Sequence, residues 1–210
     1  MPKDFSLQFC SRSHTGKVKR NNEDYLRIHQ NGFLAAIADG MGGTDFGEVA
    51  SQIAVDASIE YLANTTSTKL LEKPAGELGN AVKYANEAII AIQRNEEKYR
   101  TMGSTLTCFL MINNQLHFSW VGDSRIYIVR PENTSIQMLT KDHTLDRNKI
   151  DATLAPDLYR RAPSILTQKV GSILLIQPDT GCFELKAGDI IVACTDGLSD
   201  RIDDQLLLEY

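Results

Sequence analysis

The sequence predicts an α+β fold from three patterns. Short apolar runs of strand length recur along the chain, and the run at 33–38 is typical of a buried strand. Two segments of the first half, 48–63 and one that begins near Pro74 and ends near Arg94, repeat apolar residues at helical spacing. The second half consists mostly of short strands joined by turn residues. Two successive helices with one apolar face each are expected to cover a face of a sheet.

The remaining elements follow from the same reading of the chain. Asn31-Gly32 predicts a tight hairpin that pairs the segment 25–30 with the strand after it. A polar loop at 64–69 separates the helices, and the polar segment at about 144–165 is expected to form a surface flap. Further strands are predicted at 5–10, 103–112, 116–121, 125–129, 136–139, 166–170, 182–185 and 190–195, and a capped helix begins within 203–210.

Length and charge limit the classes of protein that this chain can represent. A chain of 210 residues is long enough for a large core, and we expect a single domain over 1–210. The formal net charge of -5 provides no basic field for nucleic acid or anionic lipid. No apolar run reaches the length of a membrane span, and the first residues lack the shape of a signal peptide. The four cysteines are scattered, so we expect reduced thiols in a cytoplasmic protein rather than disulfides or zinc ligands.

Three predicted strands lead into an aspartate. The runs before Asp39, Asp123 and Asp196 are all apolar. If the strand ends converge, three ionised carboxylates meet at a dry edge, where they repel one another unless a cation lies between them. Oxygen ligands of this kind suit magnesium or manganese. Asp-Gly is also ordinary turn chemistry at a strand end, and that alternative would explain a single acid of this kind without a metal.

Six short motifs occur in order along the chain: Gly-x-Val-x-x-Asn-Asn-Glu-Asp at 16–24, Ala-Asp-Gly-Met-Gly-Gly at 38–43, Gly-Ser-Thr at 103–105, Val-Gly-Asp-Ser-Arg at 121–125, Leu-Thr-x-Asp-His at 139–143 and Thr-Asp-Gly-Leu-Ser-Asp at 195–200. With these motifs the chain resembles the metal-dependent Ser/Thr protein phosphatases of the PPM, or type 2C, family in their compact bacterial form. The resemblance covers nearly the whole chain. It implies a central antiparallel β-sandwich flanked by helices on both sides.

The resemblance also implies a site for two ions, manganese or magnesium, which hold the water that attacks the phosphate monoester in line. Asp39 matches the acid that bridges both ions, Glu23 a ligand of the second ion, and Asp196 a ligand of the first. Gly40 has no Cβ, so its carbonyl can approach a metal or a metal-bound water. Asp24 follows Glu23 on an extended segment and points the other way, so we expect it to act through water or the backbone. A third, weaker metal site is matched by Asp123, Asp196 and Asp200.

The chain departs from the family pattern in three places. Family members usually carry an arginine four residues before the glutamate, where it binds the substrate phosphate. Lys19 keeps the charge there without the fork of two donors, and Arg20 stands beside it. Met41 occupies the position of a histidine that is proposed as the general acid in many eukaryotic members. The family's last helix and strand, which supply a further metal-binding aspartate, have no counterpart before Tyr210, so we expect the first ion to be held by fewer carboxylates.

The resemblance implies an enzyme that removes phosphate from phosphorylated Ser/Thr proteins and opposes a protein kinase in signalling, and we expect a monomer. Two other functions stay open: a phosphoprotein-binding or regulatory module with a weakened metal site, and a hydrolase of small phosphoesters. The basic residues of the flap form either a solvated face or a contact to phosphoprotein substrates. We expect Asp142 and His143 to make structural hydrogen bonds, and Ser124 and Arg125 to be turn and strand residues.

Overall fold

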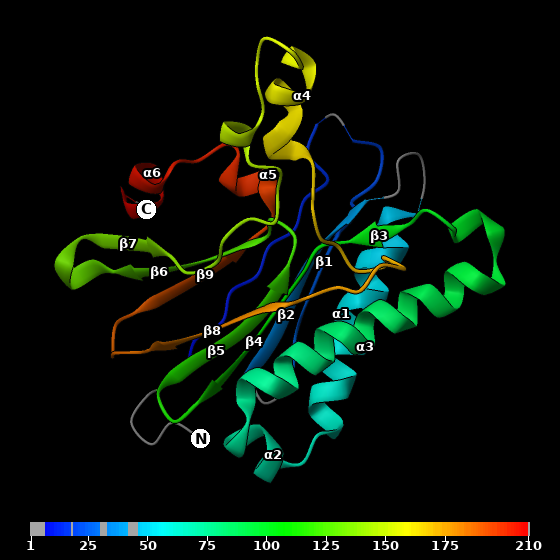
Figure 1. The fold of residues 1–210 in the computed structure, drawn as a ribbon. Helices are drawn as coiled ribbons and strands as arrows, with labels where there is room; N and C mark the ends of the chain where they lie inside the picture. The colour runs from blue at the N-terminus through cyan, green and yellow to red at the C-terminus, as the bar shows by residue number, and fades with distance from the viewer. Residues whose placement is uncertain (1–6, 18, 30–32, 42–45, 210) are drawn as a thin grey trace.

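Two antiparallel sheets stack on each other in the computed structural model, which describes residues 7–17, 19–29, 33–41 and 46–209 (Figure 1). The larger sheet has the order β1-β2-β4-β5-β8, with β3 paired to the end of β2, and the smaller has the order β7-β6-β9. The strands are β1 Asp24–Ile28, β2 Leu34–Met41, β3 Gly103–Ser104, β4 Leu106–Ile112, β5 Gln115–Val121, β6 Arg125–Arg130, β7 Ser135–Met138, β8 Asp179–Glu184 and β9 Ile190–Cys194. The helices are α1 Gly47–Asn64, α2 Ser67–Glu72, α3 Pro74–Asn95, α4 Pro156–Arg161, α5 Asp196–Ser199 and α6 Asp204–Glu209, with short 3-10 turns at Glu97–Tyr99, Pro131–Asn133, Arg147–Lys149 and Ala162–Ser164.

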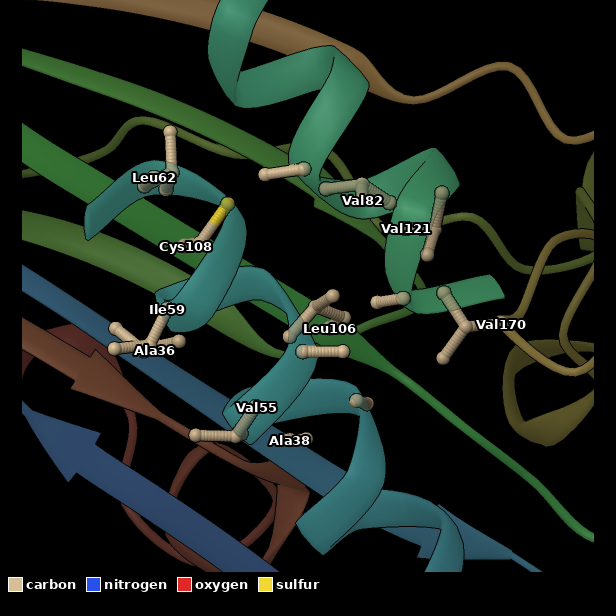
Figure 2. Packing of buried hydrophobic residues seen from close by; sticks show 14 of the residues in the cluster. Ala36, Ala38, Val55, Ile59, Leu62, Val82, Leu106, Cys108, Val121 and Val170 are labelled. Atoms are coloured by element: carbon tan, nitrogen blue, oxygen red, sulfur yellow. The ribbon is translucent and has the colours of Figure 1, made fainter. Parts of the chain in front are cut away.

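One core lies between the larger sheet and the two long helices. α1 and α3 run next to each other along one face of that sheet (Figure 1). Figure 2 shows Val55 and Ile59 of α1 against Ala36 and Ala38 of β2, all nearly fully buried. The short alanine side chains leave room for the branched side chains above them, so that the helix packs closely on the strand. The two predicted helices and the sheet face that they cover are therefore confirmed.

A second core lies between the two sheets. Leu116, Phe118 and Trp120 alternate along β5 and so share one face of the strand. They pack against Ile126 and Ile128 of β6 in the smaller sheet. The Trp120 indole N–H donates to the Lys141 carbonyl at 2.9 Å, which satisfies its polar atom inside this core. The antiparallel sandwich is thus held by apolar contact between its two sheets.

Helices also lie beside the smaller sheet. α5 contacts β9, and α6 contacts β7. The backbone N–H of Leu206 donates to the Asp203 carboxylate at 2.9 Å, so α6 has the capped start that was predicted. The α4 segment stands away from the sandwich (Figure 1). Within the described ranges, no helix is both long and apolar enough to cross a membrane.

Three predictions of local structure are wrong. Residues 7–10 form no strand, although Leu7 packs against the core between the sheets. The segment 166–170 forms no strand either and makes two isolated bridges, Leu166 to Thr144 and Val170 to Ser104. The loop at 64–69 contains the start of α2, because the Thr66 hydroxyl caps that helix at the backbone N–H of Lys69.

The hairpin strands differ from the prediction in length. β1 pairs with β2 in antiparallel register as expected, while Asn31-Gly32 lies outside the described residues. β2 does not end at Asp39 but continues to Met41. It continues because β3 supplies pairing partners there, with Met41 opposite Gly103. The bridging-acid candidate therefore sits inside a paired strand, which restricts its backbone more than a strand end would.

Candidate active site

An acidic cleft of about 760 Å³ lies where the ends of the two sheets meet the base of the flap. Asp39 comes from β2, Asp123 follows β5, and Asp196 follows β9, so all three strands that lead into an acid end in this cleft. The end of the flap contributes Pro163, Ser164 and Ile165, and Leu166 follows it in the cleft wall. The acidic residues of the wall are Glu23, Asp39, Asp123, Asp142, Asp196 and Asp200, and its basic residues are Lys19, Arg125 and Lys169.

Asp39 is held by the backbone and hydroxyl groups of the Gly-Ser-Thr motif. Its backbone N–H donates to the Thr105 hydroxyl at 2.8 Å, and the Thr105 N–H donates to its carbonyl at 2.9 Å. The Ser104 hydroxyl donates to the same carbonyl at 2.8 Å. The Thr105 hydroxyl also lies 2.8 Å from the buried Ser124 hydroxyl. The sequence signal for this support was the pair of hydroxyl residues, Ser104 and Thr105, that follows Gly103. Sequence reasoning did not predict that Thr105 or Ser124 supports Asp39.

Glu23 and Gly40 are fixed to the beginning of α1. The Glu23 carbonyl accepts from the Gly40 N–H at 3.0 Å and from the Ser51 hydroxyl at 2.6 Å. A Cβ on Gly40 would lie 1.9 Å from the Gly47 carbonyl oxygen, so only glycine fits at this contact. The Glu23 carboxylate lines the cleft and pairs with the Lys19 ammonium at 3.0 Å.

Asp24 does not line the cleft. Its carboxylate accepts from the Thr195 hydroxyl at 3.1 Å, and Thr195 directly precedes Asp196. Burial raises the pKa of Asp24 above its usual range. Asp24 therefore ties the edge of the larger sheet to the loop of the smaller sheet that carries Asp196, while Glu23 faces the cleft.

The cleft acids repel one another. Burial, followed by repulsion from Asp196 and Asp24, raises the pKa of Asp39 to about 8. Burial and repulsion from Asp196 raise the pKa of Asp123 to about 6. A divalent cation would reverse both effects, because it stabilises the ionised form of each carboxylate.

The donor set therefore fits a hard cation. Carboxylate and carbonyl oxygens are the ligands that magnesium and manganese prefer. In the part of the chain that the structure describes, no three His, Cys, Asp or Glu side chains are gathered as they stand into a group that could hold an ion. The fit consequently rests on the chemistry and shared cleft of these oxygen donors, and on the repulsion between them.

Arg125 and Asp142 form an ion pair in the cleft wall. The guanidinium donates from Nε to Oδ1 at 3.0 Å and from Nη2 to Oδ2 at 2.7 Å, a fork that positions both side chains. Asp142 does not pair with His143, whose Nδ1 accepts from the Gly122 N–H at 3.2 Å. The structural roles expected for Asp142 and His143 are therefore present with separate partners. Arg125 was expected to be only a strand residue, but its side chain also forms this ion pair.

The basic residues divide into those at the cleft and those away from it. Lys19 lines the cleft, whereas Arg20 is exposed and is not part of its wall. The flap residues Arg147 and Arg160 are exposed, and Arg160 pairs with Asp157 of the same helix. Lys169, which sequence reasoning did not single out, lines the cleft.

The fold and the cleft together define the class of protein to which this chain belongs, an antiparallel sandwich with an acidic cleft of oxygen donors at one end. The family model for protein phosphatase 2C matches residues 11–209. The chain belongs to the protein phosphatase 2C family.

Named relatives agree with this membership. The Ser/Thr protein phosphatase PstP of Mycobacterium tuberculosis is 35% identical over 205 residues, which cover 97% of this chain and 38% of PstP. The protein phosphatase PhpP of Streptococcus pneumoniae is 32% identical over 203 residues, covering 93% of this chain and 80% of PhpP. The chain thus spans well under half of the length of PstP.

Solved structures share the fold. The crystal structure of the M. tuberculosis phosphatase PstP/Ppp superposes with a TM-score of 0.79 at 33% identity and covers 94% of this chain and 82% of that chain. The PstP catalytic domain in complex with two manganese ions gives a TM-score of 0.75 at 33% identity. The match covers 94% of this chain and 81% of that chain.

Proposed function

We propose that this chain is a manganese- or magnesium-dependent phosphatase that removes phosphate from phosphoserine and phosphothreonine in proteins. The observation that carries the proposal is the convergence of Asp39, Asp123 and Asp196 from both sheets in one cleft of oxygen donors. Membership of the protein phosphatase 2C family and the two manganese ions of the PstP structure support it.

The two metal ions would be held by the Gly40 carbonyl and by the carboxylates of Glu23, Asp39 and Asp196. When bound, such ions lower the pKa of a water molecule and stabilise the attacking and leaving oxygens of the phosphate ester. The bonds to Thr105 fix the backbone of Asp39, so the point from which its side chain enters the cleft is set before any ligand arrives. A third, weaker site would use Asp123, Asp196 and Asp200.

Two further residues act on the substrate side of this proposal. Lys19 stands at the cleft wall and supplies a positive charge to the phosphoryl oxygens. Met41 also lines the cleft and has no proton to donate. The leaving oxygen therefore takes its proton from water that enters the cleft.

The proposal is tested by titrating manganese into the chain with a phosphothreonine peptide, an aryl phosphate and a set of free metabolite phosphates. Hydrolysis that depends on manganese and favours the peptide is the expected result. Peptide binding without hydrolysis of any substrate would instead assign the chain to the phosphoprotein-binding modules. A preference for the free metabolite phosphates would make it a phosphomonoesterase of small molecules.

Replacing Asp123 or Asp200 with alanine separates the weaker metal site from the stronger pair. We expect turnover of the phosphopeptide to fall about tenfold, the size of effect seen when groups around a metal site are removed. Bound manganese per chain, measured after removal of free ions, should stay near the wild-type value. A variant that binds no manganese would place its residue among the ligands of the main pair.

Replacing Lys19 with arginine should lower the KM for a phosphopeptide by about tenfold, because the guanidinium adds a second charge-assisted hydrogen bond to the phosphate. Lys17→Arg is the matched control, since Lys17 is exposed and is not part of the cleft wall. Steady-state kinetics on both variants gives the comparison. An unchanged KM for Lys19→Arg would show that another group already binds the phosphate.

We propose further that the chain acts in the cytoplasm as a monomer and opposes a protein kinase. The four cysteines support a reducing environment, because all of them are free thiols and Cys108 and Cys194 are buried. Burial raises the pKa of the Cys108 thiol to about 12, which keeps it unreactive. Sedimentation of the purified chain tests the monomer, and a mass corresponding to two chains would refute it.

A further inference from the structure

Lys169 is a partly buried lysine in the wall of the acidic cleft. The other two basic residues of that wall are engaged, Lys19 with Glu23 at 3.0 Å and Arg125 with Asp142 at 2.7 Å. Among the described residues, no carboxylate lies within ion-pair distance of the Lys169 ammonium group. Its positive charge is therefore available to a ligand.

The position of Lys169 is fixed by its neighbours. Val170 and Ser104 exchange two backbone hydrogen bonds, of 3.1 and 2.9 Å. A Cβ on Gly103 would lie 3.0 and 3.1 Å from the Cδ and Cε atoms of Lys169, so the lysine stem lies over a glycine that leaves room for it. Ser104 also donates to the Asp39 carbonyl. The chain thus holds Lys169 in a defined place relative to the residue at the centre of the cleft.

Lys169 differs from Lys19 in having no carboxylate partner among the described residues. Burial lowers the pKa of Lys169, and no nearby carboxylate offsets that effect. By contrast, the hydrogen bond to Glu23 raises the pKa of Lys19, and Asp39 adds to the increase. An ammonium group that has lost water without gaining a partner is stabilised when an anionic group binds to it. The cleft therefore offers one cation that is paired with an acid and a second cation that has no carboxylate partner among the described residues.

We propose that Lys169 binds an acidic side chain next to the phosphorylated residue of a protein substrate and so gives the cleft a preference for acidic sequences. This inference rests on the proposed phosphatase function of the same cleft. The phosphoryl group belongs at the acids that would hold the ions, with Lys19 beside it. In this proposal the rest of the substrate extends along Pro163, Ser164, Ile165 and Leu166, which line the same cleft as Lys169.

The test compares two phosphothreonine peptides that differ in charge but not in shape, one with three glutamates and the other with three glutamines on each side of the phosphothreonine. We expect the wild-type chain to prefer the glutamate peptide by about fivefold in kcat/KM, the size of a partly buried ion pair. Lys169→Met should abolish this preference. Lys149→Met, at an exposed flap residue outside the cleft wall, should keep it.

Two results would overturn the inference. One is a wild-type chain that does not distinguish the peptides. The other is a Lys169→Met variant that slows both peptides and an aryl phosphate by the same factor, because Lys169 would then act on the phosphoryl group itself. A merely structural role would also lower all three rates together and would leave the ratio between the peptides unchanged.

A binding measurement separates this inference from the proposed function. The same peptides, made with a phosphonate that cannot be hydrolysed and a fluorescent label, are titrated with each variant and followed by anisotropy. A chain that hydrolyses nothing but binds the glutamate peptide more tightly through Lys169 would refute the phosphatase and keep the inference. Equal binding of both peptides would refute the inference whatever the activity.

Discussion

Asp39→Asn is expected to lower manganese-dependent phosphatase activity by at least about a thousandfold while the chain stays folded. A neutral amide cannot bridge two cations, and no other cleft acid stands on the same strand. The backbone bonds of Asp39 to Thr105 and Ser104 use its N–H and carbonyl, so the substitution leaves them in place. The phosphopeptide assay and a melting curve on the same sample give both readouts.

The pH dependence of stability provides a second readout for Asp39→Asn. The folded chain keeps a proton on Asp39 up to about pH 8, whereas the unfolded chain releases it near the ordinary aspartate value. Without metal, this residue therefore reduces the stability of the folded chain as the pH rises from about 4 to 8. Asp39→Asn should remove that loss, so the metal-free variant should melt at or above the wild-type temperature at pH 8.

The matched control is Asp56→Asn, the same change of carboxylate to amide at a partly exposed residue of α1. Asp56 pairs with Arg27 at 2.9 Å, outside the cleft. The Asp56→Asn variant should keep the wild-type phosphatase activity. An Asp39→Asn variant that retains most of the manganese-dependent rate would show that Asp39 is not the bridging ligand.

Gly40→Ala is expected to destabilise the chain by about 3 kcal/mol or more, enough to prevent much of it from accumulating in folded form. The new Cβ would lie 1.9 Å from the Gly47 carbonyl oxygen and 2.8 Å from the Glu23 carbonyl oxygen. Both contacts are with backbone, which cannot rotate away as a flexible side chain can. The start of α1 would have to move away from β2, and Glu23 would move with it.

Urea unfolding measures this effect, and Gly76→Ala is the matched control. Gly76 lies in α3, where the nearest atom to a new Cβ is 3.8 Å away. That change should raise stability by about 0.5–1 kcal/mol, because alanine favours a helix more than glycine does. A Gly40→Ala variant as stable as the wild type would mean that β2 and α1 are farther apart than the structure has them.

Local pattern was enough for most elements of the fold. The apolar spacing of α1 and α3 and the apolar runs of β2, β4, β5, β6 and β9 predicted those elements, because each has a period that a short window of sequence displays. It failed at 166–170, where the residues are apolar enough for a strand but find only single bridges to Ser104 and Thr144. A strand depends on its neighbour, and the neighbour is far away in the sequence.

The apolar runs before Asp39, Asp123 and Asp196 were likewise enough to predict that these acids lie together, and the resemblance to the family added Glu23 and Asp200. All five line the cleft. The order of the motifs was enough to indicate the family. Sequence reasoning could not predict the hydrogen-bond partners of those acids.

Only the tertiary structure decided which groups support and surround the acids. Thr105 reaches Asp39 across 66 residues, and Thr195 reaches Asp24 across 171. Lys169 comes to the cleft because Val170 pairs with Ser104, a bridge that no local pattern indicates. Hydrogen bonds and ion pairs depend on distance in space and not on separation along the chain. The sequence by itself therefore determined which chemical groups are present, and folding decided which residues meet.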